Sequence, residues 1–187
     1  QIQPQEQLHD HVTFETTDNI VVRFNDPRRF GSMDLAHLSS LSNHPKIRNL
    51  GPEPLDVSFD TQMMAECLRG RSKAIKLSLL DQKVISGIGN IYASECLYRA
   101  GISPRRTSSS VRGKRLERLV AAIKIVLSDA IASGGSSLRD HRQTNGELGY
   151  FQHKFLVYGK AGQDCQNKCC VAKIQHIVQS GRSTFFC

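Results

Sequence analysis

The sequence of 187 residues predicts an α+β fold, because strand-like and helix-like segments follow one another without alternating. Apolar residues alternate with polar ones over 11–24, which indicates a β-hairpin. From 58 to 134 the apolar residues recur at helical spacing. After residue 151, short apolar runs surround a group of cysteines and are typical of small strands.

The predicted hairpin turns at Thr17-Asp18-Asn19 and leads through Asn25-Asp26-Pro27 to Arg28, Arg29 and Phe30. Guanidinium groups beside an aromatic ring can clamp phosphate, fill the gap left by an extruded base, or wedge between base pairs. A salt-bridged turn with a core Phe30 is the alternative. The preceding His9-Asp10-His11 is interpreted as polar residues entering a strand, not as a metal site.

The middle of the chain is expected to be helical after a linker or extended crossover over 39–56, which contains three prolines. Three helices are predicted first, over residues 59–68, 74–80 and 90–100. Gly101 is the expected stop of the third helix. The next helix has one apolar stripe and ends at Ser133-Gly134-Gly135; the stripe consists of Leu116, Leu119, Val120, Ile123, Val126, Leu127, Ala130 and Ile131. Short strands are predicted over 155–158, 173–178 and 183–186.

The charge of the chain favours a polyanionic partner. Lys plus Arg outnumber Asp plus Glu by 25 to 17, which gives a net charge of +8 and a pI near 9.4. A basic protein without such a partner is the alternative. No apolar run approaches the roughly 18–20 residues of a membrane span, and no signal sequence is recognisable. The chain begins at Gln1, so we expect a processed, trimmed or partial product.

The cysteines of the last 23 residues suggest metal binding. Cys165 precedes Cys170 by five residues, and sixteen residues separate Cys170 from Cys187. Two strands joined by a turn, with cysteines at both ends, form a zinc-ribbon hairpin, and Zn²⁺ prefers four such ligands. The alternative is three unconnected thiols at a disordered tail. Cys169 is the spare residue of the group. Cys67 and Cys96 lie singly in helical patterns, where a free Cys usually packs as an apolar residue.

Two loops are candidates for ligand contact. The segment Ser86–Asn90 (SGIGN) can expose amide N–H groups of Gly89 and its neighbours at a helix start, where anions bind, and Asn90 can cap that helix. An ordinary interhelical turn is the alternative. Residues 136–150 are polar and have no period, as is common in functional or disordered loops.

Together these pieces resemble the formamidopyrimidine-DNA glycosylase family over nearly the whole chain. The resemblance rests on six motifs in the family order: DPRRFG (26–31), GPEPL (51–55), IK (75–76) with LLDQKVISGIGNIYASE (79–95), GGSSLRD (134–140), GYFQHKFLVYG (149–159) and RSTFFC (182–187). The family spacing also selects Cys170, which lies four residues before Ile174 and twelve before Arg182, over Cys169.

The resemblance implies an architecture and an activity. Residues 1–38 would be the tail of an N-terminal β-sandwich, 39–56 a linker, 57–150 a helix–two-turn–helix DNA-binding domain, and 151–187 a C-terminally incomplete zinc finger. The family removes oxidised purines (8-oxoguanine and formamidopyrimidines) from double-stranded DNA by base flipping and Schiff-base chemistry, followed by β,δ-elimination. The resemblance also implies a monomeric, cytoplasmic, nucleoid-associated bacterial enzyme with one Zn²⁺ and no membrane partner.

The same resemblance gives roles to matched residues. Arg28 would fill the vacated stack, and Phe30 would wedge beside the orphan base. Arg182 would grip phosphates around the lesion and take part in δ-elimination as the one catalytic residue present. The other implied sites are phosphate contacts at Arg29, Lys76, Gly89 and Asn90, a lesion-reading loop with Ser136, Ser137, Arg139 and Tyr150, and zinc ligands at Cys165, Cys170 and Cys187.

The sequence departs from the family in two places. The family nucleophile is an N-terminal Pro followed by a Glu, but this chain starts Gln1-Ile2. The last zinc-ligand Cys of the family is also missing from this sequence, and the gap from Cys165 to Cys170 is wider than the commonest gap in the family. We therefore expect a fragment that binds DNA weakly and has no glycosylase activity. The alternatives are an endonuclease VIII-like glycosylase for oxidised pyrimidines, a non-catalytic DNA-binding module, and a purely structural zinc-ribbon protein.

Overall fold

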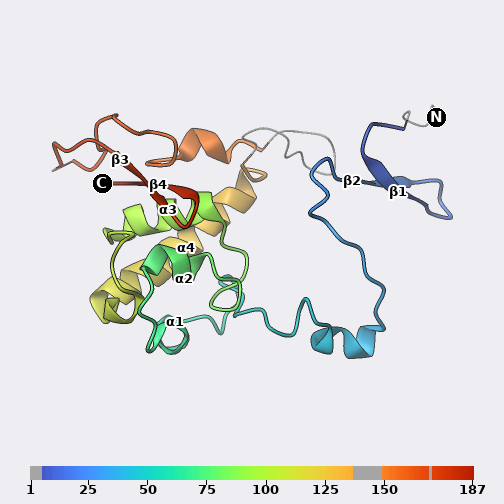
Figure 1. Ribbon diagram of the computed structural model, residues 1–187, viewed down its shortest axis with the longest axis horizontal. Coiled ribbons are helices and arrows are strands. Elements are labelled where there is room, and N and C mark those ends of the chain that lie inside the picture. The colour runs from blue at the N-terminus through green and yellow to red at the C-terminus, as the bar shows by residue number, and fades with distance from the viewer. Residues whose placement is uncertain (1–5, 137–148, 169) are drawn as a thin grey trace. The chain divides into compact units, whose positions relative to one another are not determined.

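The computed structural model describes residues 6–136, 149–168 and 170–187, and it divides into two compact units, residues 1–47 and 48–187 (Figure 1). The first unit contains strands β1 (Asp10–Glu15) and β2 (Val21–Asn25) and a 3₁₀ helix η1 (Leu38–Asn43). The two strands pair antiparallel, with Val12 opposite Phe24 and Phe14 opposite Val22. This confirms the predicted hairpin, whereas η1 lies in the region predicted as linker.

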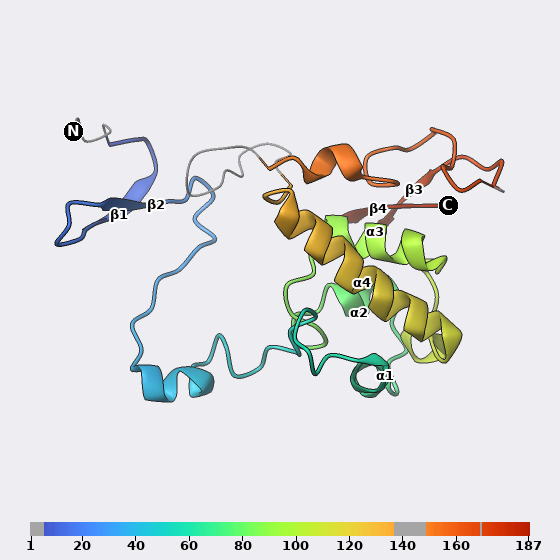
Figure 2. The ribbon, with the colours of Figure 1, turned by 180° about the vertical axis from the view of Figure 1, so that it is seen from behind.

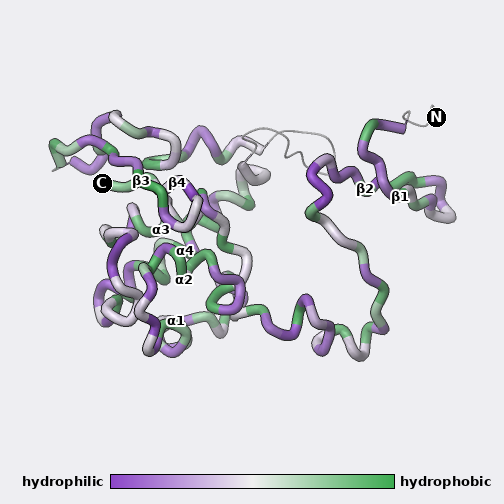
Figure 3. The backbone as a smooth tube through the Cα atoms, in the orientation of Figure 1, coloured by the Kyte–Doolittle hydropathy of each residue, from purple (hydrophilic) through white to green (hydrophobic). Residues whose placement is uncertain are grey.

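The first unit has no core of its own. None of its residues 6–47 is buried. Hydrophobic residues (green in Figure 3) are interspersed with polar ones along the β1–β2 hairpin, and Phe14 and Val22 are both about half exposed. A two-stranded hairpin is marginal by itself, because it offers too little apolar surface to bury.

The second unit is built around four helices, as the helical periodicity predicts. They are α1 (Thr61–Leu68), α2 (Ile75–Leu79), α3 (Asn90–Ala100) and α4 (Lys114–Ala132). The side chain of Asp60 caps α1 by accepting a bond from Met63 N at 2.8 Å. Gly101 ends α3 in the left-handed conformation (φ 65°), the conformation that favours glycine. The remaining short helices of the unit are η2 (Ser108–Ser110) and η3 (Phe151–Lys154).

The core of the second unit lies between these helices. Helix α4 lies against α1 and α3 (Figure 2), and its apolar stripe belongs to the core that these helices share. Of the predicted stripe all residues are buried except Ile131, which is exposed near the end of the helix. Residues 48–56, assigned to a linker from the sequence, belong to this unit, and Gly51 N donates to Gln82 O at 2.7 Å. A side chain at Gly51 would collide with the backbone of Val84, which explains the glycine there.

A second hairpin lies against α3. Strands β3 (Gln175–Gln179) and β4 (Arg182–Phe186) pair antiparallel, and Ser180-Gly181 connect them with positive φ angles of 48° and 73°. This two-residue turn matches the twist of the strands. A small apolar cluster of Val157, Cys165 and Ile174 packs against Phe185 of β4.

The predicted strand over 155–158 is wrong. The segment follows η3 and forms bends and turns instead. The physical reason is that the backbone N–H groups of Leu156, Val157 and Tyr158 donate to the carboxylate of Glu95 and not to a neighbouring strand. None of the helices among the described residues has the length and apolar character required to span a bilayer.

Candidate nucleic-acid interface and metal centre

One hydrogen-bond cluster joins the start of α3 to strand β4. Lys76 Nζ donates to Asn90 Oδ1 at 2.6 Å, to Ser183 O at 2.9 Å and to Thr184 Oγ1 at 2.7 Å. Asn90 Nδ2 donates to the same Ser183 O at 3.0 Å and to the hydroxyl of Tyr158 at 3.1 Å. The cluster therefore fixes the backbone one residue after Arg182 against the first turn of α3.

Asn90 does not cap α3, which corrects the sequence expectation. Gly89 occupies the N-cap position and provides no side-chain bond, while Asn90 is the first helical residue. Its side chain reaches sideways into the cluster because Lys76 and Ser183 lie beside it. Asn90 is partly exposed, whereas Lys76, also predicted to contact phosphate, is 0% exposed. Burial lowers the pKa of Lys76 to about 8, and the nearby charge of Arg182 acts in the same direction.

The loop before α3 is braced from inside. Gln82 Oε1 accepts from Gly87 N at 2.9 Å, and Gln82 Nε2 donates to Ile88 O at 3.1 Å. Gly87 has φ +75°, so a side chain there would be strained. A Cβ at Gly89 would meet no protein atom within 4 Å. Glycine at 89 therefore keeps clear the space outside the loop, directly beside the first amide groups of α3.

Arg182 is exposed and begins β4 directly after the tight turn. It borders a hollow of about 380 Å³ together with Lys73, Asp81 and Ser180. The turn geometry and the anchored Ser183 carbonyl set its backbone on both sides. The backbone of Arg182 is thus fixed, while its positively charged side chain is exposed to solvent.

Glu95 of α3 is, besides Lys76, a charged side chain that is fully buried. It lies against residues 156–158, the segment before the cysteines. Its carboxylate is 0% exposed and accepts backbone N–H groups from Leu156 at 2.9 Å, Val157 at 3.0 Å and Tyr158 at 2.9 Å. Three amide donors compensate a buried carboxylate that has lost its water. Glu95 therefore anchors residues 156–158, and with them Tyr158, against α3.

The cysteine prediction is confirmed in its coarser form. The sulfur atoms of Cys165, Cys170 and Cys187 all lie within 4.8 Å of one another, and the last two are 3.4 Å apart. Thiolates on a tetrahedral Zn²⁺ with bonds of about 2.3 Å would be about 3.8 Å apart. The three sulfurs therefore suit a soft metal ion such as Zn²⁺. Cys169 lies outside the described residues.

Tyr98 connects this thiol group to α3. Its hydroxyl lies 3.1 Å from Cys165 Sγ. Burial, and then the bond to Cys165, raises the pKa of Tyr98 to about 12, so its hydroxyl can donate to Cys165 when that sulfur is a thiolate. That same bond is the main cause that lowers the pKa of the Cys165 thiol. A hydrogen bond of this kind orients a metal ligand from outside the coordination sphere.

In the first unit, Asp26 organises the loop that carries the predicted wedge. Its carboxylate accepts from Arg28 N at 3.2 Å and from Gly31 N at 2.6 Å. Arg29 takes a positive φ of 54°, and Phe30 is 79% exposed. The Arg28 guanidinium lies over the Phe30 ring, 4.6 Å from its centroid. The alternative of a core Phe30 is thus wrong within this unit.

The predicted lesion loop is described only at its ends. Ser136 and Tyr150 form an isolated antiparallel bridge, and Tyr92 of α3 shares a hydrogen bond of 3.2 Å with Ser136 Oγ. A Cβ at Gly149 would collide with the backbone of Gly135 at 2.3 Å, so the ends approach very closely. Ser137 and Arg139, also predicted as loop residues, lie outside the described residues.

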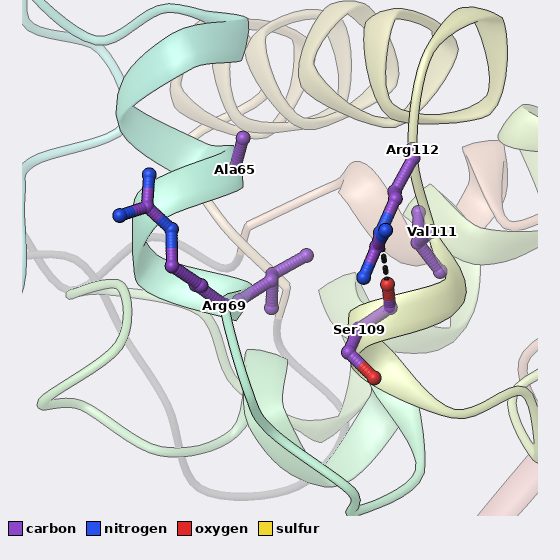
Figure 4. Close-up of a pocket in the computed structure, with 6 residues that line it drawn as sticks. Ala65, Arg69, Ser109, Val111 and Arg112 are labelled. Carbon is purple, nitrogen blue, oxygen red and sulfur yellow. Dashed lines mark hydrogen bonds between the residues drawn. The ribbon is translucent and has the colours of Figure 1, made fainter.

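A cavity elsewhere on the second unit is also bordered by arginines, but it does not bring their charges together. It measures about 260 Å³ and lies between the end of α1 and residues 109–112 (Figure 4). The guanidinium groups of Arg69 and Arg112 lie on separate sides of it, and Arg112 donates to Ser109 O. Because the two cations do not converge, the cavity is not built around an anion.

Sequence reasoning missed Glu95, Tyr98, Tyr158 and Thr184. A charged residue or a hydroxyl on the buried side of a helix or strand is a usable signal, because such groups need a partner. The sequence does not reveal which partner, since each one lies 60 or more residues away along the chain.

These features define a class of protein: a helical module whose third helix is clamped to a cysteine-bearing hairpin. A family model described as the formamidopyrimidine-DNA glycosylase H2TH domain matches residues 50–142. The chain is 57% identical over 183 residues to the formamidopyrimidine-DNA glycosylase of Rhodospirillum rubrum, and 53% identical over 185 residues to that of Azorhizobium caulinodans. Each alignment covers 96% of this chain, but only 65% and 63% of the respective relative.

Solved structures agree with this similarity. The MutM (Fpg) protein of Thermus thermophilus superposes with a TM-score of 0.86 at 35% identity and covers 98% of this chain and 68% of that one. The Lactococcus lactis Fpg in complex with DNA containing an abasic site gives 0.88 at 34% identity, with coverage of 100% and 67%. The chain belongs to the formamidopyrimidine-DNA glycosylase family.

Proposed function

We propose that this chain is the DNA-gripping part of a bacterial base-excision repair glycosylase and AP lyase that acts on oxidised purines in double-stranded DNA. Its relatives bear the name formamidopyrimidine-DNA glycosylase, and one similar structure is a MutM complex with DNA containing carbocyclic 8-oxo-G. The observation that carries the proposal is the cluster that ties the start of α3 to the residue after Arg182.

The phosphate grip consists of two elements held together by that cluster. The first amide groups of α3, beside the open position at Gly89, attract anions through free N–H groups and the helix dipole. Asn90, partly exposed, is a further proposed phosphate contact, for which its amide would give up its bond to Ser183 O or to the Tyr158 hydroxyl. Arg182 adds a guanidinium suited to bidentate phosphate contact, and we assign it the δ-elimination role.

The first unit provides the wedge. Phe30 is exposed and stacked beneath the Arg28 guanidinium, so the pair presents a flat apolar face and a cation together. We propose that Phe30 enters the base stack, that Arg28 occupies the vacated position, and that Arg29 contacts the backbone. Unstacking a base costs a few kcal/mol, which the wedge and the phosphate contacts must offset.

The segment between Ser136 and Tyr150, which also contains Ser137 and Arg139, is the proposed lesion-reading loop. Its described ends support this role, because the Ser136–Tyr150 bridge holds them beside Tyr92 of α3. The loop is thereby anchored to the same helix whose start binds phosphate.

We propose Zn²⁺ as the metal held by Cys165, Cys170 and Cys187, one ion per chain. Bound zinc would supply folding free energy to the hairpin and no redox or acid–base chemistry. Residues 1–38 are the proposed sandwich tail, 57–150 the proposed helix–two-turn–helix domain and 151–187 the proposed zinc finger. Residues 39–56 are the proposed linker, and its part from 48 to 56 packs on the second unit. The protein is proposed to act as a monomer in the bacterial cytoplasm, at the nucleoid.

The test is a salt titration of DNA binding. Affinity for a short duplex with 8-oxoguanine opposite cytosine is measured at several salt concentrations, beside undamaged duplex and duplex with thymine glycol. Each phosphate contact should contribute about 0.9 to the slope of log K against log salt. We expect a clear negative slope and a preference for the purine lesion. A flat plot would contradict DNA binding, and a preference for thymine glycol would favour the endonuclease VIII-like alternative.

Catalysis by these 187 residues alone is tested separately. We propose that none of these residues acts as the Schiff-base nucleophile. We expect no borohydride-trapped complex with 8-oxoguanine duplex. A trapped complex would show that another amine of the chain can act.

A further inference from the structure

Lys76 is an ammonium group enclosed completely by protein. It lies in the first turn of α2 and is 0% exposed. None of the ion pairs found among the described residues involves it, and the charge that lowers its pKa is the cation of Arg182. Burying an unpaired ammonium is strongly unfavourable unless all its hydrogens find acceptors. The residues around Lys76 must therefore provide a hydrogen-bond acceptor for each hydrogen of its ammonium group.

All three ammonium hydrogens are satisfied. An ammonium has three donors, and Lys76 has three acceptors at 2.6, 2.9 and 2.7 Å. Two of the three belong to β4, 107 and 108 positions away in the sequence, and the third is Asn90 at the start of α3. Thr184, which supplies the only hydroxyl, is itself 0% exposed.

A direct phosphate contact would require Lys76 to give up these bonds. The ammonium would have to leave a site in which no donor is spare, and it would take one donor away from each of Asn90 Oδ1, Ser183 O and Thr184 Oγ1. The start of α3 and Arg182, by contrast, lie at or near the surface already. The geometry therefore separates the residues that meet solvent from the residue that holds them together.

We propose that Lys76 is a positioning residue that docks strand β4 on the start of α3 and so sets the spacing between Arg182 and the α3 amides, without touching DNA itself. This inference rests on the proposed DNA-binding function. It replaces the expectation, drawn from the sequence, that Lys76 contacts the sugar–phosphate backbone.

The two roles differ in a measurable quantity. Removing a cation that neutralises a phosphate lowers the affinity and also reduces the salt slope by about 1. Removing a positioning residue lowers the affinity because the remaining contacts are misplaced. The slope then changes little.

The experiment compares three variants of the full chain with the unaltered protein on a short duplex with 8-oxoguanine. We expect Lys76→Met to weaken binding about tenfold or more with the slope kept, and Arg182→Ala to lower both affinity and slope by about one contact. Lys114→Met removes one exposed charge at the start of α4 and should leave both unchanged. A slope lowered by about 1 in Lys76→Met would overturn the inference.

A second variant keeps the test valid if Lys76→Met does not fold. Thr184→Val preserves the shape and the charge of the protein but removes one acceptor of Lys76. We expect weaker binding and faster hydrogen exchange at the amides of β3 and β4 in the absence of DNA. Unchanged exchange and unchanged affinity in Thr184→Val would also overturn the inference.

Two further controls separate docking from general stability and from the function itself. Val126→Ala removes core volume in α4 and should lower stability without changing DNA affinity at a temperature well below unfolding. If this variant weakens binding as much as Thr184→Val does, Lys76 has a merely structural role. A flat plot of log K against log salt for the unaltered protein would instead contradict the proposed function. The exchange measurement would still report on the docking of β4 on the start of α3.

Discussion

The two units of the molecule bury their side chains to very different extents. Residues 48–187 enclose an apolar core that runs from Phe59 to Phe155 and a smaller cluster under the β3–β4 hairpin. None of residues 6–47 is buried, although this stretch is not poor in apolar residues. The difference shows that apolar composition alone does not make a core. Apolar faces must also meet, and a single hairpin has only one pair of strands to offer.

The same difference decides how each proposed site is held. In the second unit, Lys76, Glu95 and Tyr98 connect distant segments through buried or partly buried hydrogen bonds. In the first unit, the bonds seen among residues 6–47 hold the tip with Arg28 and Phe30 through near neighbours along the chain, chiefly Asp26. The geometry of the proposed phosphate-binding site is thus fixed by tertiary structure, whereas the geometry of the proposed wedge is fixed locally.

The strongest test of this comparison is one substitution made in both units. Leu119→Ala in α4 removes a fully buried side chain and should lower the free energy of unfolding by about 2–5 kcal/mol. Leu35→Ala removes the same atoms from a fully exposed position and should change it by less than about 0.5 kcal/mol. Denaturant unfolding followed by circular dichroism measures both. Similar losses would mean that the first unit has a core of its own.

Removing the buried carboxylate should have the next largest effect. Glu95→Ala leaves three buried N–H groups without an acceptor, so we expect a loss of about 3 kcal/mol. Hydrogen exchange should accelerate at Leu156, Val157 and Tyr158. Glu95→Gln keeps one oxygen and should cost less. If both variants match the unaltered protein, residues 156–158 are held by packing alone.

Metal affinity should respond to the hydroxyl of Tyr98. Tyr98→Phe removes the donor to Cys165 and should weaken zinc binding about tenfold, because outer-shell bonds orient metal ligands. Competition with a chromophoric chelator measures this affinity directly. Tyr92→Phe, a matched change on the same helix, removes a hydroxyl that points to Ser136 and should have no effect. Equal effects of the two variants would argue against the role of Tyr98.

The smallest expected effect is local to the first unit. Asp26→Ala frees the amides of Arg28 and Gly31 and should cost about 1 kcal/mol of loop stability. Amide exchange measured by NMR should rise at these two positions and stay unchanged throughout residues 48–136. Asp18→Ala, at the turn of the same hairpin, is the control and should leave the Arg28 and Gly31 amides protected. A change that spreads into the second unit would contradict the view that the tip is held locally.

The sequence by itself determined the helices, the first hairpin and the grouping of the three cysteines. Apolar periodicity, the stop at Gly101 and the spacing of cysteines are all local patterns, and each one reports on residues near it in the chain. It also determined the family, since motifs in a fixed order carry that information.

Only the tertiary structure decided what the polar groups do. It turned the predicted strand 155–158 into a segment held by Glu95, removed Asn90 from the cap position, and enclosed Lys76 among acceptors up to 108 positions away. The physical reason is that a buried donor or acceptor must be satisfied, but any suitable partner in the folded chain can satisfy it. The local sequence shows which buried polar groups need a hydrogen-bond partner, and the packing of distant segments determines which residue that partner is.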